Sequence, residues 1–362
     1  MPELNLGKRY FAVGKATVSL NETQKYAKEA IEKLIEDGVY EFESVPCLCG
    51  SSVDEELLCA TVDRYGLRHH TVICQNCGLI RTNPRLTQTS YKHFYENWYR
   101  QLYSTYSHLD ENSFRSEFEV YARFRGKRIL EFLQNQQIDV SGKTVLEIGC
   151  AGGWNLSVLE KSGAQVIGFD YDPKQIEFGK KLFGLDLHYG GIKEAIDQRI
   201  KADIVILAHV VEHFTDPIIQ LKNLIKLLYL PGGVCYLESP GVLNIHNSYI
   251  DPIGLLQNAH TYSFSTITLS YLVKRCEYEI QYCDEFVRML CKPSNKEFAD
   301  VEIKRQHSKE VIEYLKDCEK KRIWRAMVKR CRLNLRRYVV AALKMVGIYP
   351  LVRKLYHAAR QE

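Results

Sequence analysis

Short apolar stretches alternate with amphipathic ones from Lys143 onward, and this alternation predicts a parallel sheet with helices between its strands. The expected strands are residues 144–148, 165–169, 187–189, 203–207 and 234–238. Two more, residues 279–283 and 286–290, are expected to form a terminal hairpin. Their spacing leaves room for a helix in most gaps, so the fold class is α/β.

Upstream of the sheet the pattern changes. Residues 22–37 carry apolar side chains at helical spacing, with Asn21 as a candidate N-cap and Gly38 at the end. Residues 45–86 are rich in cysteine and turn residues, and residues 91–133 are aromatic, polar and helical in pattern.

The chain is therefore divided into five parts. These are an N-terminal helical segment (1–44), a cysteine-rich unit (45–86), a helical connector (87–140), the α/β domain (141–292) and a basic helical extension (293–362).

Charge is unevenly distributed over the 362 residues. The net charge is +5, but residues 301–362 hold 17 Lys and Arg against 6 Asp and Glu, so the remainder is near −6. A basic tail on an acidic body suggests an anionic contact, although a solvated helical face accounts for it equally well. The apolar stretch at 338–352 is too short and interrupted to span a bilayer.

The N-terminus does not resemble a signal peptide, because the first eleven residues are too polar. Twelve cysteines without an export signal favour reduced thiols or metal ligands over disulfides. The expected location is the cytoplasm, with the tail allowing peripheral contact with the inner face of the membrane.

A glycine-rich turn follows the first expected strand, in the sequence VLEIGCAGGWNL. Glycines permit close backbone approach of a nucleoside, but the spacing is not the G-x-G-x-x-G of dinucleotide sites. Glu147, two residues before Gly149, would repel a pyrophosphate and suits a cationic ligand. Asp170 ends the next strand, at a distance that suits hydrogen bonds to ribose hydroxyls.

The ordered set Glu147, Gly149, Gly153 and Asp170 resembles motifs I and II of the class I methyltransferases, which use S-adenosylmethionine. The resemblance implies a Rossmann-like sheet of seven strands with a reversed last strand. Ala151 stands where the family usually has the middle glycine, and it is small enough to preserve cofactor binding. The resemblance also assigns three further residues to the cofactor site, namely Tyr171, Gly191 and His209.

His209, Glu212 and His213 follow the fourth expected strand and are predicted at the opening of a helix. As H-x-x-E-H they match a zinc-protease motif, but that motif needs a long surrounding helix, whereas a strand runs directly into this one. In the methyltransferase interpretation the loop lies beside the cofactor. Some family members bind a divalent cation through E-x-x-E-H, and His209 in place of the first Glu argues against this here. Simple capping of the helix is the structural alternative.

Cys47, Cys49, Cys74 and Cys77 form a C-x-C…C-x-x-C array, whose four thiolates suit structural zinc. The segment CQNCGLIRTNPR resembles the zinc-binding domain at the front of sugar and polysaccharide methyltransferases. That domain usually begins with C-x-x-C, so Cys59 could replace Cys47 as a ligand. Reduced core cysteines are the alternative.

A loop of about 25 residues follows the fifth expected strand and contains His260 among polar and aromatic residues. The stretch resembles sugar C-methyltransferases, in which the matching histidine is a base. His260 is therefore a candidate general base, with His213 and His209 as the other catalytic candidates. Stapling of the loop is the alternative for His260. The aromatic residues of 91–106 are compatible with a carbohydrate acceptor, but a helical core is favoured for them.

The predicted function is methyl transfer from S-adenosylmethionine to a sugar or glycan acceptor in polysaccharide or nucleotide-sugar biosynthesis. The alternatives are methylation of RNA or a small metabolite, and a non-catalytic scaffold that binds the cofactor; nucleic acid is disfavoured by the acidic body. Residues 320–362 are basic with interleaved apolar residues, which suggests an amphipathic helix on an anionic membrane. A nucleic-acid contact and a plain helical cap are the other interpretations of this tail.

Overall fold

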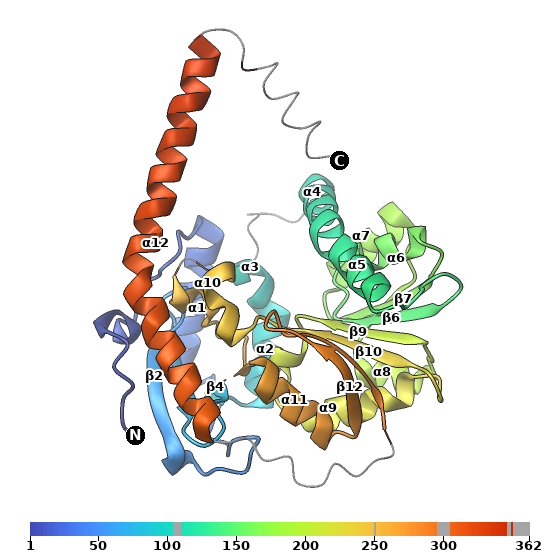
Figure 1. The fold of residues 1–362 in the computed structure, drawn as a ribbon, viewed down its shortest axis with the longest axis horizontal. Helices are drawn as coiled ribbons and strands as arrows, with labels where there is room; N and C mark the ends of the chain where they lie inside the picture. The colour runs from blue at the N-terminus through green and yellow to red at the C-terminus, as the bar shows by residue number, and fades with distance from the viewer. Residues whose placement is uncertain (104–109, 250, 295–304, 346–348, 350–362) are drawn as a thin grey trace.

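The computed structural model describes residues 1–103, 110–249, 251–294, 305–345 and 349 of the chain. Figure 1 shows three parts: a sheet with helices on both faces, an N-terminal unit beside it, and one long helix that rises beyond both.

The larger sheet consists of β6 (Thr144–Ile148), β7 (Gln165–Asp170), β8 (Leu187–Tyr189), β9 (Ile204–Ala208), β10 (Val234–Glu238), β12 (Tyr278–Cys283) and β13 (Arg288–Pro293). Their order is β12-β13-β10-β9-β6-β7-β8, and β13 is antiparallel to both of its neighbours. The seven-stranded sheet with one reversed strand is confirmed. The last strand begins two residues later than predicted, because Asp284 accepts hydrogen bonds from the Phe286 and Arg288 amides and folds that segment into a turn.

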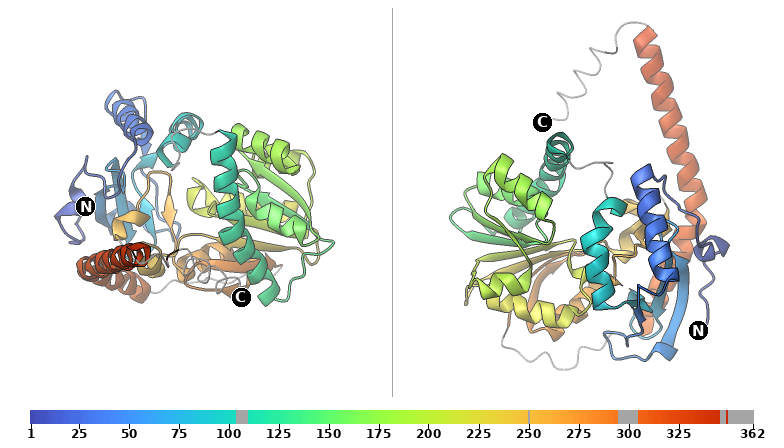
Figure 2. Two further views of the ribbon diagram at one scale, coloured as in Figure 1. Left: turned by 90° about the horizontal axis from the view of Figure 1, so that it is seen from above. Right: turned by 180° about the vertical axis from the view of Figure 1, so that it is seen from behind.

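Helices cover both faces of this sheet, as the buried pattern of its strands requires. One face is covered by α4 (Glu111–Tyr121), α5 (Lys127–Asn135), α6 (Trp154–Lys161) and α7 (Pro173–Phe183). The other is covered by α8 (Ile192–Asp197), α9 (Pro217–Leu224) and α11 (Thr266–Arg275). Figure 2 shows the same layers from above and from behind.

The N-terminal unit contains a four-stranded antiparallel sheet with the order β11-β4-β3-β2. Its strands are β2 (Glu56–Val62), β3 (Arg68–Cys74), β4 (Ile80–Thr82) and β11 (Tyr262–Ser263). The strand β11 comes from the loop after β10, so a segment of the α/β domain completes the sheet of the cysteine-rich unit. A separate pair joins β1 (Phe42–Glu43) to β5 (Arg85–Leu86).

Helices α1 (Glu22–Glu36), α2 (Gln88–Asn97) and α3 (Tyr99–Tyr103) pack together beside this sheet. The predicted first helix is confirmed, since Asn21 accepts a hydrogen bond from the Gln24 amide and forms a capping box. The expected loop of about 25 residues contains the short helix α10 (Ile245–Ser248) before it reaches β11.

The basic extension forms α12 (Arg305–Met345), and part of the predicted tail lies outside the described residues. Its first turns are held by the body. The hydroxyl of Ser308 donates to the Cys74 carbonyl at 3.1 Å, and Val311 and Leu315 are buried. Among the described helices, none is both long enough and apolar enough to cross a bilayer.

Candidate functional site

The carboxyl ends of β6, β7, β8, β9 and β10 meet at one edge of the larger sheet, where ligands of α/β folds bind. Every candidate residue proposed for the cofactor lies near the end of one of these strands or follows it. Four neighbouring strands, in the order β9-β6-β7-β8, carry these residues and bring them to the same edge of the sheet.

Glu147, the fourth residue of β6, is buried, and its Oε1 accepts a hydrogen bond from Asn155 Nδ2 at 2.7 Å. Its Oε2 has no hydrogen-bond partner among the described residues. Burial raises the pKa of this carboxyl to about 8. An unpaired buried carboxylate is costly unless a ligand completes its contacts, so this atom marks a place for a hydrogen-bond donor or a cation.

The glycine turn after β6 needs its glycines for a reason that the sequence did not show. Gly149 and Gly153 have φ angles of 74° and 82°, in the left-handed region that glycine adopts readily. A Cβ at Gly149 would lie 2.4 Å from Val210, and one at Gly153 would lie 2.6 Å from Leu185. The glycines thus let the turn pack tightly against the protein itself.

Asp170 ties the second strand to this turn. Its Oδ2 accepts a hydrogen bond from the Ala151 amide at 2.7 Å, and its Oδ1 accepts one from the Asp172 amide at 2.8 Å. Burial raises the pKa of Asp170 to about 6. Next to it, the Tyr171 hydroxyl would lie 2.9 Å from a Cβ on Gly191, so these two candidates are also neighbours.

The segment after β9 is not the opening of a helix, and that prediction was wrong. His209 has a φ of 61°, Val211–His213 form a single 3-10 turn, and α9 starts only at Pro217. The left-handed residue breaks helical geometry at the first histidine. The zinc-protease interpretation is therefore excluded, since it requires both histidines on one continuous helix.

His209 is engaged by two carboxylates. Its Nε2 lies 3.3 Å from Glu238 Oε1, and its Nδ1 lies 3.6 Å from Glu212 Oε1. Burial and the charge of Arg125 act to lower the pKa of His209, but the two carboxylates outweigh them and raise it. For the carboxyl of Glu238, burial acts to raise the pKa, but the neighbouring His209 and Arg128 outweigh it and lower the pKa to about 2. His209 is thus the ion-paired histidine of the site.

His213 and His260 face each other across the site, with ring centroids 4.8 Å apart and planes at 89°. The sequence places them 47 residues apart, but the structure makes them direct neighbours. Burial lowers the pKa of His213 and lowers that of His260 well below 6.5. Both rings are therefore neutral at cellular pH.

The surroundings of His213 fix its tautomer. Its Nδ1 lies 3.0 Å from the Ala259 carbonyl and 2.9 Å from the Tyr95 hydroxyl. The carbonyl can only accept a hydrogen bond, and the Tyr95 hydroxyl can donate to the same carbonyl at 3.3 Å. This arrangement places the proton on Nδ1 and leaves the lone pair on Nε2.

Glu212 completes the group, because its ligand atom and those of His213 and His260 lie within 4.8 Å of one another. Glu212 is buried, and neither carboxylate oxygen has a hydrogen-bond partner among the described residues. Two imidazoles and a carboxylate could hold a transition metal better than a hard cation. They could equally hold the hydroxyl groups of an acceptor.

The loop that carries His260 is fastened to the loop that carries His213. Thr261 donates from its amide and its hydroxyl to the Glu212 carbonyl, both at 2.9 Å. From the N-terminal unit, Arg85 donates to the Thr215 carbonyl at 2.6 Å. Thr261 therefore holds this loop against the loop of His213, and the imidazole of His260 is left available to the site.

A row of tyrosines lies beside this group, in the aromatic segment that was predicted to form a helical core. Tyr95, Tyr99 and Tyr103 are half-buried, with successive ring centroids 5.0 and 4.8 Å apart. The Tyr99 ring centroid lies 6.3 Å from that of His213, and burial together with the charges of Asp170 and Glu212 raises the pKa of Tyr99.

The three tyrosines also pack against the hydrophobic cluster that contains Phe94 and Leu102, so the predicted helical core is confirmed. Their place beside the histidine pair was not predicted, although a tyrosine at every fourth residue was the available signal.

The four predicted zinc ligands lie together at the N-terminal unit. Cys47 and Cys77 sulfurs are 3.5 Å apart, Cys49 and Cys74 sulfurs are 3.7 Å apart, and all four lie within 4.8 Å. Tetrahedral zinc with Zn–S bonds of about 2.3 Å sets its sulfurs about 3.8 Å apart, so the array fits the ion. Cys59 lies elsewhere, with its thiol directed at the Leu57 carbonyl.

Comparison with known proteins agrees with the geometry of the sheet edge. A family described as "Methyltransferase domain" matches residues 121–281. A probable S-adenosylmethionine-dependent methyltransferase of Mycolicibacterium smegmatis is 25% identical over 142 residues, which are 39% of this chain and 54% of that protein. A ubiquinone biosynthesis O-methyltransferase of Coxiella burnetii is 30% identical over 109 residues, 29% of this chain and 46% of that protein.

The chain thus spans about half the length of the curated relatives that it matches. Among solved structures, human N-acetylserotonin methyltransferase in complex with S-adenosylmethionine is 17% identical, with a TM-score of 0.42 and coverage of 55% of this chain and 60% of that one. The family match and the curated relatives agree on one activity class: the chain carries an S-adenosylmethionine-dependent methyltransferase domain.

Proposed function

We propose that this protein transfers a methyl group from S-adenosylmethionine to a hydroxyl of a sugar or glycan, with His213 as the general base and His260 beside it. The observation that carries the proposal is the His213 ring, whose Nδ1 is held by the Ala259 carbonyl at 3.0 Å while Nε2 keeps its lone pair. A neutral imidazole at the carboxyl end of β9 can take a hydroxyl proton as the new C–O bond forms.

The cofactor supplies an electrophilic methyl group on a sulfonium sulfur. Glu147 would pair with its cationic end through the unpartnered Oε2, and Asp170 would accept from its ribose hydroxyls. The Asp170 carboxylate already accepts two backbone hydrogen bonds, which leaves further lone pairs for the ribose.

A sugar acceptor is supported by the side chains around the histidine pair. The tyrosine row offers aromatic surface and hydroxyl groups, and the Glu212 carboxylate, whose Oε1 lies 3.6 Å from His209 Nδ1, offers its Oε2 as an acceptor to sugar hydroxyls. Arg64 lies over the Tyr103 ring at 5.5 Å and brings a positive charge to the same wall, which suits an acceptor that carries a phosphate. The resemblance of the cysteine-rich unit to that of sugar methyltransferases points the same way.

A phenol is the second candidate acceptor, because relatives in the match are ubiquinone biosynthesis O-methyltransferases. The two acceptors are separated by a direct assay. The full chain is incubated with S-adenosylmethionine and nucleotide-activated sugars, glycans, catechols or RNA, and the methylated product is detected by mass spectrometry. We expect methylation of a sugar; methylation of catechols alone, or binding of the cofactor with no turnover on any acceptor, would refute the proposal.

Cofactor affinity should rise with pH from about 6.5 to 8.5. The free enzyme holds a proton on Glu147, whose pKa is about 8, and a cation beside it favours the ionised form. Binding therefore releases a proton, and affinity increases by at most about tenfold per pH unit until the free carboxyl is ionised. Calorimetry at several pH values measures this. Glu147→Gln should flatten the profile, and the exposed Glu160→Gln should leave it unchanged.

A further inference from the structure

The helix α12 changes character along its length. Below Glu319 it belongs to the body: Val311, Leu315 and Cys318 are buried, and Glu319 Oε2 binds Arg9 Nη2 at 2.5 Å. Among the side chains described beyond Glu319, none is buried. The upper part of α12 thus stands free of the body, as Figures 1 and 2 show.

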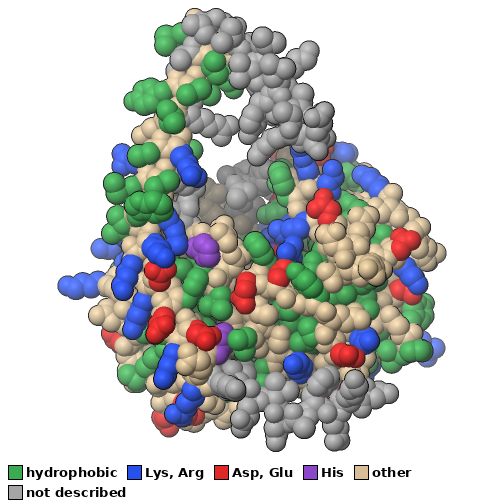
Figure 3. Space-filling view, in the orientation of Figure 1, with side chains coloured by type: hydrophobic (Ala, Val, Ile, Leu, Met, Phe, Trp, Pro, Cys, Tyr) green, Lys and Arg blue, Asp and Glu red, His purple; other side chains and the backbone are tan. Residues whose placement is uncertain are grey.

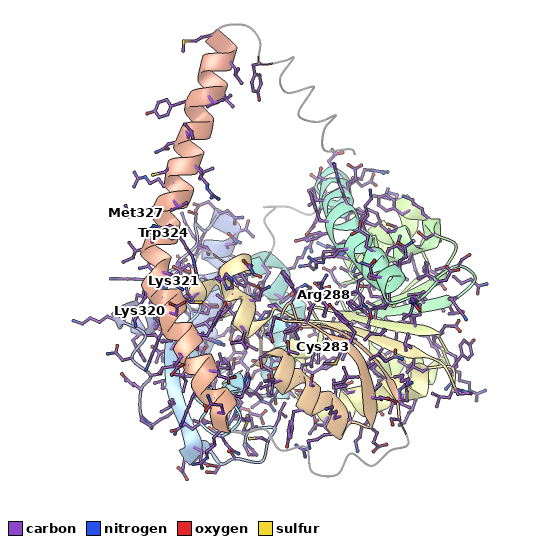
Figure 4. The ribbon with its side chains drawn as sticks, in the orientation of Figure 1. Cys283, Arg288, Lys320, Lys321, Trp324 and Met327 are labelled. Atoms are coloured by element: carbon purple, nitrogen blue, oxygen red, sulfur yellow. The ribbon has the colours of Figure 1, made fainter. Side chains whose placement is uncertain are left out.

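This free part exposes large apolar side chains. The exposed fractions are 61% for Ile323, 66% for Trp324, 61% for Met327, 65% for Leu335 and 74% for Tyr338. With about 100° per residue, these five and Met345 project within roughly a third of the circumference of the helix. Val339 lies about 40° beyond one edge of this arc, and Leu333, which is 48% exposed, projects from the opposite side of the helix. Figure 3 shows apolar side chains along this part of the helix, and Figure 4 labels Trp324 and Met327 on it.

The apolar face points away from the protein. Val311, Leu315 and Cys318, which contact the body, project in a direction about half a turn from the centre of the exposed apolar arc. The face therefore cannot be covered by the described part of this chain without breaking the lower anchor. Contiguous exposed apolar surface of this kind marks an interaction site.

Positive charge borders the apolar face. Arg330 projects at one edge, Arg325 and Arg332 project beyond the other, and Lys320 lies at the lower end, all with half-exposed or exposed side chains. From residue 320 to residue 361 the sequence contains no Asp or Glu. The occupant of the face must therefore be apolar and supply its own negative charge.

We propose that residues 322–345 of α12 lie in the surface of an anionic lipid bilayer, with the apolar face inserted and the arginines on the headgroups. A second copy of the chain fits less well, because pairing of two such helices would bring arginines together with no carboxylate between them. Trp324 and Tyr338 are side chains that favour the membrane interface. A basic amphipathic helix in this orientation binds by apolar insertion together with attraction to anionic lipid.

Vesicle co-sedimentation of the full chain tests the proposal. We expect binding to phosphatidylcholine vesicles with about 30% phosphatidylglycerol, much weaker binding to phosphatidylcholine alone, and a decline as salt rises. Trp324→Asp with Met327→Asp should reduce the bound fraction about tenfold or more, and Ile219→Asp, an equally polar change at a 55% exposed position on α9, should not. Melting temperatures check that both variants fold.

Three outcomes would overturn the proposal. The first is equal vesicle binding by the wild type and the double variant. The second is a dimer in light scattering that the double variant abolishes while vesicle binding is absent. The third is binding to duplex nucleic acid but not to anionic vesicles, which would identify a polyanion instead of a lipid surface.

Discussion

His213→Ala is expected to lower the turnover number of sugar methylation by about 10²–10⁴-fold, the usual contribution of a general base. Cofactor affinity should stay within about twofold, because His213 belongs to the acceptor side of the site and no cofactor candidate contacts its ring. The same step predicts the pH profile. Burial lowers the pKa of His213 from 6.5, so the turnover number should be flat at neutral pH and should decline only below pH 6.5.

Two measurements separate a base from a structural residue. Exogenous imidazole should restore part of the turnover of His213→Ala, and the Tyr95→Phe variant should show a smaller loss, since Ala259 still holds Nδ1. His246→Ala, at an exposed histidine on α10, is the matched control. Near-normal turnover of His213→Ala would remove this residue from the mechanism.

His260→Ala completes the comparison. A loss that imidazole rescues in His260→Ala but not in His213→Ala would transfer the role of base to His260. If both variants lose turnover and added divalent metal changes the turnover of the wild type, that result would instead indicate that Glu212, His213 and His260 hold an ion.

Cys77→Ser is expected to abolish zinc binding and to lower the free energy of unfolding by more than about 4 kcal/mol. Zinc-binding free energy is part of folding free energy, and loss of a metal is among the few single changes with so large an effect. The cysteine cluster and the start of α12 are packed together, because a Cβ at Gly78 would lie 3.0 Å from Ser308. The structural cost of Cys77→Ser should therefore extend beyond the cysteines. Metal analysis and chemical denaturation measure both effects.

Cys59→Ser is the control for this change. Cys59 is as buried as Cys77, but its thiol lies outside the cluster. We expect it to retain about one zinc per chain and to lose only about 1 kcal/mol. Equal zinc content in Cys77→Ser and the wild type would contradict the assignment.

The α/β domain was predictable because its strands are buried on both faces and therefore read as short apolar runs. Three of them, β6, β8 and β10, have the predicted bounds, β7 ends one residue later, and β9 is shifted by one residue at both ends. Glu147, Gly149 and Asp170 were found for the same reason, because each occupies a fixed place at the end of a strand.

The acceptor side was harder to predict, since it is assembled from distant segments. No local pattern shows that Ala259 holds His213, or that Glu238 engages His209. The left-handed conformation of His209 also escaped prediction, because it is imposed by tertiary contacts such as the hydrogen bond of its amide to the Glu238 carbonyl at 2.7 Å. The neighbouring sequence, rich in helix-compatible residues, favoured the wrong structure.

The pairing of β11 with β4 sets a limit on how such proteins can exchange parts. Tyr262 and Ser263 belong by sequence to the α/β domain, yet they form the edge of the sheet built by the cysteine-rich unit. A hybrid that took residues 45–86 from another protein would inherit a foreign partner for this strand, and with it a displaced His260. Recombination that keeps the enzyme working must therefore move two stretches of gene together, although almost two hundred codons separate them.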